Sequence, residues 1–290
     1  MPLKFYIFQE EIMLAILRKF KRDIRYEVHD VFRMITQRHR LNTVVNHKEI
    51  RIVGLRRTGN HAIINWIRKQ HCGEVWHLNS VRAGENPYRY LYSHYPRESL
   101  RNEALGNFVT KDCLLYNYED HDLDLVVNSK FEKKHDLYIG KSSTRYDLII
   151  LRDPFNLMAS RIKNNYLNVR NPNGNPTQLW IEYAREFLGE TNYLQNNKIC
   201  CNYNRWFSDI EYRKEFASKL GLEFTDRGIN QVKTEGGGSS FDGEKFDGKA
   251  TQMDVINRYK LFQDNPIYQQ LVNNEELREY SRKIFGNLDS

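Results

Sequence analysis

The stretch RIVGLRRTGNHAIINWI, Arg51 to Ile67, contains a strand-like run, two spaced glycines and a helix-like run. It begins with an apolar, strand-like pair, Ile52 and Val53, and continues with Gly54 and Gly59 at the glycine spacing of a phosphate-binding P-loop. An amphipathic run follows and predicts a helix. An asparagine and a histidine replace the lysine and the Ser/Thr of a P-loop, so the usual magnesium ligand is missing. The stretch therefore predicts a strand, an anion-binding turn and a helix whose ligand is not Mg-ATP.

The composition is that of a folded, mildly basic protein. The 290 residues are 40% hydrophobic and 13% aromatic, which is enough to build one α/β domain with appendages. A net charge of +7 suits an anionic small ligand, a nucleic acid or an acidic surface and does not choose among them. The four cysteines have no metal-ligand spacing and are typical of a reduced compartment. No apolar run approaches the roughly 18 residues of a membrane helix, and no signal-peptide pattern is present, so we expect a cytoplasmic protein.

The N-terminal region predicts a long helix over residues 3–40, because apolar residues recur there at spacings of three and four. Basic residues lie between them. One interpretation is a basic amphipathic helix that contacts a membrane surface or a partner. The interpretation that we favour is a helix packed on the core with a solvated basic face. We expect residues 1–45 to form a helical extension and residues 46–290 to form the α/β domain.

The rest of the chain alternates strand and helix patterns. Strands are predicted at 51–54, 74–78, 112–118, 146–151 and 198–203. Helices are predicted at 59–70, 122–135, 154–165, 177–188, 209–220, 251–262 and 274–285. Residues 79–107 predict a long, partly irregular segment, and 168–176 and 235–248 predict loops. This order predicts an α/β, P-loop-like, three-layer fold with a central, mainly parallel sheet, whose ligands lie at the carboxyl ends of the strands.

The turn after the first strand supplies the first group of candidate binding residues, which are Arg56, Arg57, Thr58, Gly59, Asn60 and His61. A glycine-rich turn before a helix directs backbone N–H groups and the helix N-terminus at an anion. Arg57 can add a bidentate grip on phosphate-type oxygens, and Thr58 can donate its hydroxyl. The alternative is a plain strand–turn–helix corner whose arginines are solvated.

A second motif lies in YDLIILRDPFNLMASRI, residues 146–162. Arg152 follows a buried strand, Pro154 begins a helix, and Ser160 lies roughly two turns along it. The Arg152 guanidinium and the Ser160 hydroxyl could hold a second phosphate group. The alternative is an arginine paired with a carboxylate, followed by a serine without a role.

Together the two motifs resemble the sulfotransferases that use 3′-phosphoadenosine-5′-phosphosulfate as donor. RTGNHA, Arg57–Ala62, loosely matches the family's 5′-phosphosulfate loop, [KR]-S-G-T-T-W. RDPFNLMAS, Arg152–Ser160, matches its 3′-phosphate motif, R-[ND]-P-x(5)-S, in residues and spacing. The resemblance covers about residues 50–285 and implies the P-loop-like sulfotransferase fold. It departs from the family at Asn60 and His61, which replace a threonine pair, and at Ala62, which replaces a tryptophan.

The resemblance also implies roles for further residues. Tyr203 would lie near the adenine, Lys233 would contact the 3′-phosphate, and Gly237 and Gly238 would belong to the glycine-rich loop over the nucleotide. Arg57 would neutralise the bridging oxygen as the donor bond breaks, and the N–H groups of residues 58–61 would hold the 5′-phosphate. No metal is required for this transfer.

The general base is expected just beyond the strand at 112–118. Glu119 is the first choice because it directly follows the strand end, and His121 is second because its ordinary pKa lies nearer neutrality. Asp120 is a further candidate, and His94 lies in a predicted substrate loop. The alternative for the acidic candidates is an exposed turn that caps the next helix.

The acceptor is expected to be a hydroxylated small molecule or a carbohydrate, because the segments 86–97 and 164–176 are rich in tyrosine and asparagine. Two other functions stay open. One is a catalytically silent nucleotide-binding or scaffold protein, and the other is a small-molecule kinase. Nucleic-acid binding ranks last, because the positive charge is spread along the chain without an aromatic–basic motif.

Overall fold

The centre of the protein is a five-stranded sheet. A computed structural model describes residues 2–36, 42–232 and 238–287. Its strands are β1 (Val44–Gly54), β2 (Val75–Leu78), β3 (Lys111–Glu119), β4 (Lys141–Leu151) and β5 (Ile199–Asn202). They lie in the order β2-β3-β1-β4-β5, and every pairing is parallel. The predicted α/β fold with a central parallel sheet is therefore confirmed.

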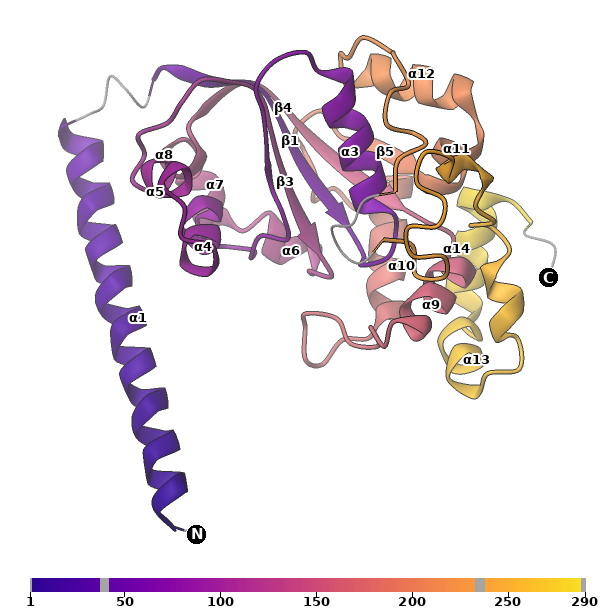
Figure 1. The fold of residues 1–290 in the computed structure, drawn as a ribbon, viewed down its shortest axis with the longest axis horizontal. Coiled ribbons are helices and arrows are strands. Elements are labelled where there is room, and N and C mark those ends of the chain that lie inside the picture. The colour runs from indigo at the N-terminus through magenta and orange to yellow at the C-terminus, as the bar shows by residue number, and fades with distance from the viewer. Residues whose placement is uncertain (1, 37–41, 233–237, 288–290) are drawn as a thin grey trace.

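Helices cover both faces of this sheet (Figure 1). One face packs against α3 (Asn60–Gln70), α11 (Tyr203–Ser208) and α12 (Ile210–Lys219). The other packs against α4 (Pro87–His94), α6 (Leu123–Val126), α7 (Ser129–Lys133), α8 (His135–Ile139), α9 (Pro154–Lys163), α10 (Pro176–Leu188), α13 (Pro266–Val272) and α14 (Glu275–Phe285). Neighbouring residues of one strand, such as Ile52 and Val53, enter opposite core layers, because side chains alternate along a strand. The result is the predicted three-layer arrangement.

The register of the strands brings the candidate loops to one edge of the sheet. Gly54, at the end of β1, lies opposite Glu119 of β3 and Ile150 of β4. Leu151 lies opposite Asn202 of β5. The loops that follow these four strands therefore start side by side, and the P-loop-like turn lies in the middle of them.

Several elements differ from the sequence-based prediction. The segment expected to be irregular holds α4 and α5 (Glu98–Ala104), and α4 begins where Asn86 accepts the Arg89 N–H before Pro87. The helix predicted at 122–135 is three short helices, α6, α7 and α8. Tyr203 does not end a strand but begins α11, because Asn202 caps that helix. The helix predicted at 251–262 is two 3₁₀ turns, η1 (Ala250–Gln252) and η2 (Arg258–Phe262), and α13 was not predicted.

The helix α1 (Pro2–Thr36) extends away from the body (Figure 1), and the last residues of the predicted helix lie outside the described ones. Its interpretation as a helix packed on the core is wrong for the described side chains, since Phe20, Ile24 and Val28 are all exposed. Its contacts with the body are polar. Asp30 forms an ion pair with Arg89, and Arg33 donates to the Leu137 carbonyl at 3.1 Å. Helix α1 therefore contacts the domain through buried polar side chains, and its apolar side chains stay exposed to solvent.

A buried polar network around Glu49 ties β1 to β3, β4 and α8. The His135 Nε2 lies 2.9 Å from both carboxylate oxygens of Glu49, and the Tyr116 and Ser142 hydroxyls also donate to this carboxylate. The Glu49 carboxylate raises the pKa of His135 to about 9 against the opposing effect of burial. His135 is therefore charged at neutral pH and forms a buried ion pair.

This ion pair predicts a pH-dependent stability. Because the folded-state pKa of His135 lies above its unfolded value of about 6.5, its contribution is fully present below pH 6.5 and is lost as pH rises through about 9. That contribution is on the order of 3 kcal/mol. Urea unfolding of the wild type between pH 6 and 9.5 should show this loss, and His135→Gln should show a flatter profile. His94→Gln, at an exposed histidine, should keep the wild-type profile, whereas parallel profiles for wild type and His135→Gln would contradict the assignment.

Candidate functional site

The loop after β1 is a tight turn that is fixed by a hydrogen bond to a residue outside it. Arg57 and Gly59 adopt left-handed backbone conformations, with φ of 72° and 100°, and the Thr58 N–H donates to the Leu55 carbonyl at 3.2 Å. Gly59 precedes α3, so the first N–H groups of that helix are left for another acceptor. The Arg56 N–H donates to Asp120 Oδ1 at 2.9 Å, which fixes the turn against the residue that follows β3.

Asn60, where a P-loop carries lysine, connects this turn with Glu119. Its side chain lies against Gly54, where a Cβ would come within 2.4 Å of the Asn60 Oδ1. Its Nδ2 donates to the Leu55 carbonyl at 3.1 Å and to Glu119 Oε1 at 3.0 Å. Gly54 is therefore required by the close approach of Asn60, and Asn60 orients the Glu119 carboxylate at the strand ends.

Arg152 is a buried cation whose hydrogen-bond partners are carbonyl groups. It is 3% exposed and follows β4, just before the α9 cap residue Asp153. Its two Nη atoms donate to the carbonyls of Arg57 and Val255, at 3.2 and 2.6 Å, and its guanidinium lies 5.2 Å from the centre of the Tyr203 ring. Among the described residues no carboxylate lies within 4 Å of it, and its Nε has no partner. The alternative of a strand-end arginine paired with a carboxylate is therefore wrong for the described part of the chain.

The second motif and the glycine-rich loop meet over the first loop. The Ser160 Oγ, buried on α9, lies 2.5 Å from the Ser240 Oγ. Arg57 Nη2 donates to the same Ser240 hydroxyl and, at 3.1 Å, to the Gly238 carbonyl. Ser240 thus connects the two groups that the sequence analysis assigned to two different phosphates.

A cavity opens between these elements, beside the N-terminus of α3. Its wall is aromatic on one side, where Tyr203 stacks on Phe207 with ring centres 6.1 Å apart and Trp206 adjoins them. Tyr203 also closes on Gly59, where a Cβ would lie 2.1 Å from its ring. A cationic wall of Arg57, Arg152 and other polar groups faces this aromatic side. Such a cavity fits an anionic ligand with a flat, stacking part.

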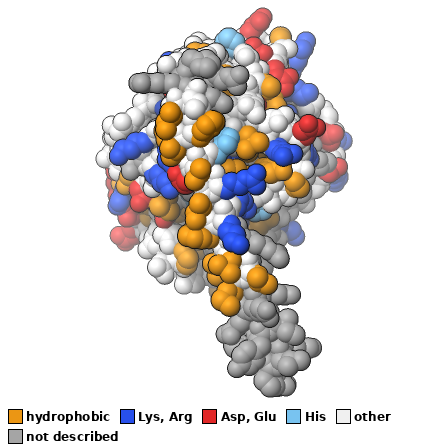
Figure 2. Space-filling model, turned by 90° about the vertical axis from the view of Figure 1, so that its left-hand side faces the viewer, with side chains coloured by type: hydrophobic (Ala, Val, Ile, Leu, Met, Phe, Trp, Pro, Cys, Tyr) orange, Lys and Arg blue, Asp and Glu red, His pale blue; other side chains and the backbone are white. Residues whose placement is uncertain are grey.

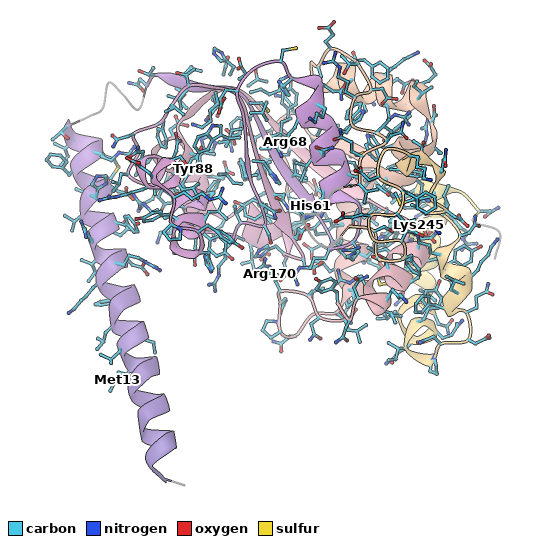
Figure 3. All side chains as sticks on the ribbon, in the orientation of Figure 1. Met13, His61, Arg68, Tyr88, Arg170 and Lys245 are labelled. Atoms are coloured by element: carbon cyan, nitrogen blue, oxygen red, sulfur yellow. The ribbon has the colours of Figure 1, made fainter. Side chains whose placement is uncertain are left out.

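Most residues singled out from the sequence line this cavity. They are Arg57, Gly59, Asn60, His61, Glu119, Arg152, Ser160, Tyr203 and Gly238. His61 lies at the start of α3, and its Nδ1 has no partner among the described residues (Figure 3). Lys233 and Gly237 lie outside the described residues.

Five candidates lie elsewhere. The Arg56 side chain turns to Asp120 and to the Tyr166 ring, and Thr58 is buried beneath the turn. Asp120 is locked in a fully buried ion pair with Arg161 at 2.8 Å. His121 is buried, and burial together with the nearby Arg170 cation lowers its pKa to about 4. His94 is exposed in a separate groove between β2 and α4.

Other residues that were not among the candidates also line the cavity, above all Ser240 and Arg258. Arg258, on η2, is buried and donates to the Asp242 carboxylate at 2.6 Å. Burial, and then the neighbouring Arg152 cation, lower the pKa of Arg258. No local signal marks this arginine, because the fold alone brings residue 258 beside residue 152. Trp206 and Phe207 follow Tyr203 at helical spacing and could have been found had α11 been predicted.

The described residues offer neither a metal-ligand cluster nor a membrane-spanning helix. No group of three or more His, Cys, Asp or Glu side chains in the described part of the chain is placed to hold a metal ion. No helix in the same residues is long and apolar enough to span a bilayer.

Gly59→Ala should damage the site through its contact with Tyr203. The new Cβ would stand on a residue with a left-handed φ and would also enter the Tyr203 ring. We expect a loss of about 2–3 kcal/mol in the free energy of unfolding, measured by urea denaturation. Gly84→Ala is the matched control, because Gly84 also has a positive φ but has no other atom within 4 Å of the place where a Cβ would stand. It should cost about 1 kcal/mol, and equal losses for both variants would contradict the contact with Tyr203.

Comparison with known proteins gives distant structural likenesses. No protein-family model matches the chain, and no curated protein matches it significantly. The chain is similar to the sulfotransferase domain of the olefin synthase from Synechococcus PCC 7002, with 12% identity, a TM-score of 0.43 and coverage of 85% of this chain and 98% of that one. It is also similar to the mouse sulfotransferase SULT7A1 complexed with PAP, with 11% identity, a TM-score of 0.43 and coverage of 84% and 92%. Both are sulfotransferases, the class that the two motifs resemble, and likenesses this distant carry no argument about the chemistry of this chain.

Proposed function

We propose that this protein is a sulfotransferase that moves a sulfuryl group from 3′-phosphoadenosine-5′-phosphosulfate to a hydroxyl group of an acceptor. The observation that carries the proposal is the buried Arg152, which faces the same cavity as Arg57 and has no carboxylate partner among the described residues. A buried guanidinium that no carboxylate contacts is costly, and a ligand anion in contact with it offsets that cost. The match of Arg152–Ser160 to the 3′-phosphate motif supports the same conclusion.

The residues around the cavity fit this donor. Arg152 and Ser160 would hold the 3′-phosphate, and the unpaired Nε of Arg152 offers it a donor. Arg57 and the N-terminus of α3 would hold the 5′-phosphosulfate. Tyr203, backed by the Phe207 ring, offers a stacking surface for the adenine. The Ser240 hydroxyl, bonded to Arg57 and Ser160, would exchange these contacts for phosphate oxygens.

The donor, when bound, supplies an activated sulfuryl group on a phosphate leaving group. The contribution of this chain is charge and orientation. The Arg57 guanidinium places positive charge where the leaving oxygens gain negative charge. Glu119 would accept the proton of the acceptor hydroxyl, because its carboxylate lines the cavity and Asn60 holds it by a 3.0 Å hydrogen bond. His121 does not line that cavity, so we assign it a structural role.

The acceptor would lie in the groove between β2 and α4, at the ends of the strands next to Glu119. Arg170 joins the two places, since its Nε donates to the Glu119 carbonyl at 3.3 Å and its Nη2 donates to the Ser80 hydroxyl at 3.0 Å. Figure 3 shows Arg170 beside the strand ends. The groove offers aromatic and polar side chains, which suits a carbohydrate or another hydroxylated small molecule.

A panel of sugars, aliphatic alcohols and apolar phenols tests this choice of acceptor, and transfer to apolar phenols alone would contradict it. The cytoplasmic location expected from the sequence stays a prediction.

Arg152→Ala should abolish tight binding of 3′-phosphoadenosine-5′-phosphate. Loss of a buried charge contact costs about 2–5 kcal/mol, so the dissociation constant measured by calorimetry without magnesium should rise at least about 30-fold. Arg205→Ala is the control, because Arg205 is an exposed arginine on the same helix as Tyr203. It should bind as the wild type does. A wild type that binds ATP as well as this nucleotide would overturn the donor assignment.

Glu119→Gln should separate binding from transfer. The amide oxygen can still accept from Asn60, so nucleotide affinity should stay within about twofold while the transfer rate falls by roughly 10²–10⁴-fold. His121→Gln should retain most of the wild-type rate. Undiminished transfer by Glu119→Gln would remove this residue from the mechanism. Nucleotide binding without transfer to any acceptor in the wild type would favour the silent binding protein.

A further inference from the structure

The apolar side of α1 faces solvent, and none of its described side chains belongs to the buried core of the domain. Six exposed apolar side chains recur there at spacings of three and four, and each of the six is 49–65% exposed: Met13, Leu17, Phe20, Ile24, Val28 and Val31. Figure 2 shows hydrophobic side chains running along this helix on the face turned to the viewer, with Lys and Arg beside them. A continuous apolar stripe of this kind is the feature of a helix that contacts another apolar phase.

The side of α1 that contacts the domain is polar and lies opposite the apolar stripe. Asp30 and Arg33 are buried against the body, and each follows a stripe residue, Val28 or Val31, by two positions. Two positions turn the chain by about 200° around an α-helix. The contacts of Asp30 and Arg33 with the domain therefore keep the stripe turned outward, so the domain cannot cover it without losing those contacts.

Basic residues outnumber acidic ones in the sequence of α1. Residues 2–36 contain seven Lys or Arg residues and five acidic residues. The domain engages two of those acids, since Lys134 pairs with Glu27 at 2.6 Å and Arg89 pairs with Asp30, and it also takes up Arg33. Six basic and three acidic residues of α1 are left in the sequence, and two of them, Arg22 and Asp23, lie 3.6 Å apart. Lys21 and Arg25 directly follow Phe20 and Ile24, so their Cα atoms lie at the edge of the apolar stripe.

We propose that α1 docks on an anionic lipid bilayer surface, with the apolar stripe in the boundary between headgroups and acyl chains and the flanking cations at the lipid phosphates. A helix of this length with a strongly apolar face and flanking Lys and Arg residues is built to lie in the interface plane. The stripe is broader than the narrow seam of a two-stranded coiled coil, because neighbouring pairs such as Val31 and Phe32 are both exposed. The excess of cations then selects an anionic surface over a neutral one. This inference is independent of the proposed function.

The test is co-sedimentation of the full chain with vesicles. Vesicles of phosphatidylcholine with about one third phosphatidylserine should bind the protein at least tenfold more tightly than vesicles of phosphatidylcholine alone, and added salt should weaken the binding. Lys21→Gln combined with Arg25→Gln should weaken binding roughly 30-fold, at about 1 kcal/mol for each cation.

Phe20→Glu combined with Ile24→Glu should abolish vesicle binding. Leu261→Glu is the matched control, because Leu261 is an apolar residue that is 73% exposed outside α1. It should bind vesicles as the wild type does. Thermal unfolding of each variant should match that of the wild type, because all of these side chains are exposed.

Three outcomes would overturn the proposal. Equal binding to both kinds of vesicle would remove the role of the cations. Self-association in sedimentation equilibrium that the Phe20→Glu and Ile24→Glu changes abolish, without vesicle binding, would show that a second copy of the chain covers the stripe. A monomeric protein that binds neither kind of vesicle would show that the stripe does not dock on a bilayer.

Discussion

A buried ion pair between Asp120 and Arg161 holds the candidate site together. Both side chains are fully buried, and Arg161 Nη1 donates to Asp120 Oδ1 at 2.8 Å. The same carboxylate oxygen accepts the Arg56 N–H, and Arg161 also donates to the Arg56 carbonyl at 3.2 Å. Because Asp120 follows Glu119 and Arg161 follows Ser160, this one pair positions the turn after β1, the candidate base and the second motif relative to each other.

Two buried arginines near α9, Arg152 and Arg161, differ in the partners that their side chains contact. Arg161 is matched by a carboxylate in a good geometry, which offsets much of the cost of removing both charges from water. Arg152 is as deeply buried, yet its partners are carbonyl groups and an aromatic ring. Arg161 is therefore paired within the fold, whereas Arg152 lines the cavity with no carboxylate partner among the described residues.

The two surfaces of interest lie in different parts of the molecule and use different physics. The cavity is a concave, cationic site at the carboxyl edge of the sheet, where directed hydrogen bonds decide what binds. Helix α1 carries a convex apolar stripe and lies on the opposite side of the molecule from α3 and α11 (Figure 1). The attraction of such a stripe to an anionic bilayer grows with its apolar area and its net positive charge. The polar contacts of Asp30 and Arg33 with the domain set which side of α1 is left outside.

Local patterns in the sequence predicted much of the fold. The apolar runs at 51–54, 112–118 and 146–151 predicted three strands that the structure contains as parts of β1, β3 and β4, and Pro154 predicted the start of α9. These predictions succeed because propensity, capping and alternation act among residues a few positions apart. The same signals failed where a short cap divided an element, as at Asn202 before α11, and where the helix at 122–135 broke into three.

Local spacing was enough to predict the order of the motifs along the chain, the two glycines of the turn and the Arg152–Ser160 pair. Which candidates share a cavity follows from the packing of the layers, which places Glu119 on the cavity wall, turns Arg56, Asp120 and His121 away, and adds Ser240 and Arg258. The tertiary structure also decided that the apolar side of α1 points to solvent. These outcomes depend on contacts between residues far apart in the chain, and such contacts follow from how the layers pack rather than from any local pattern.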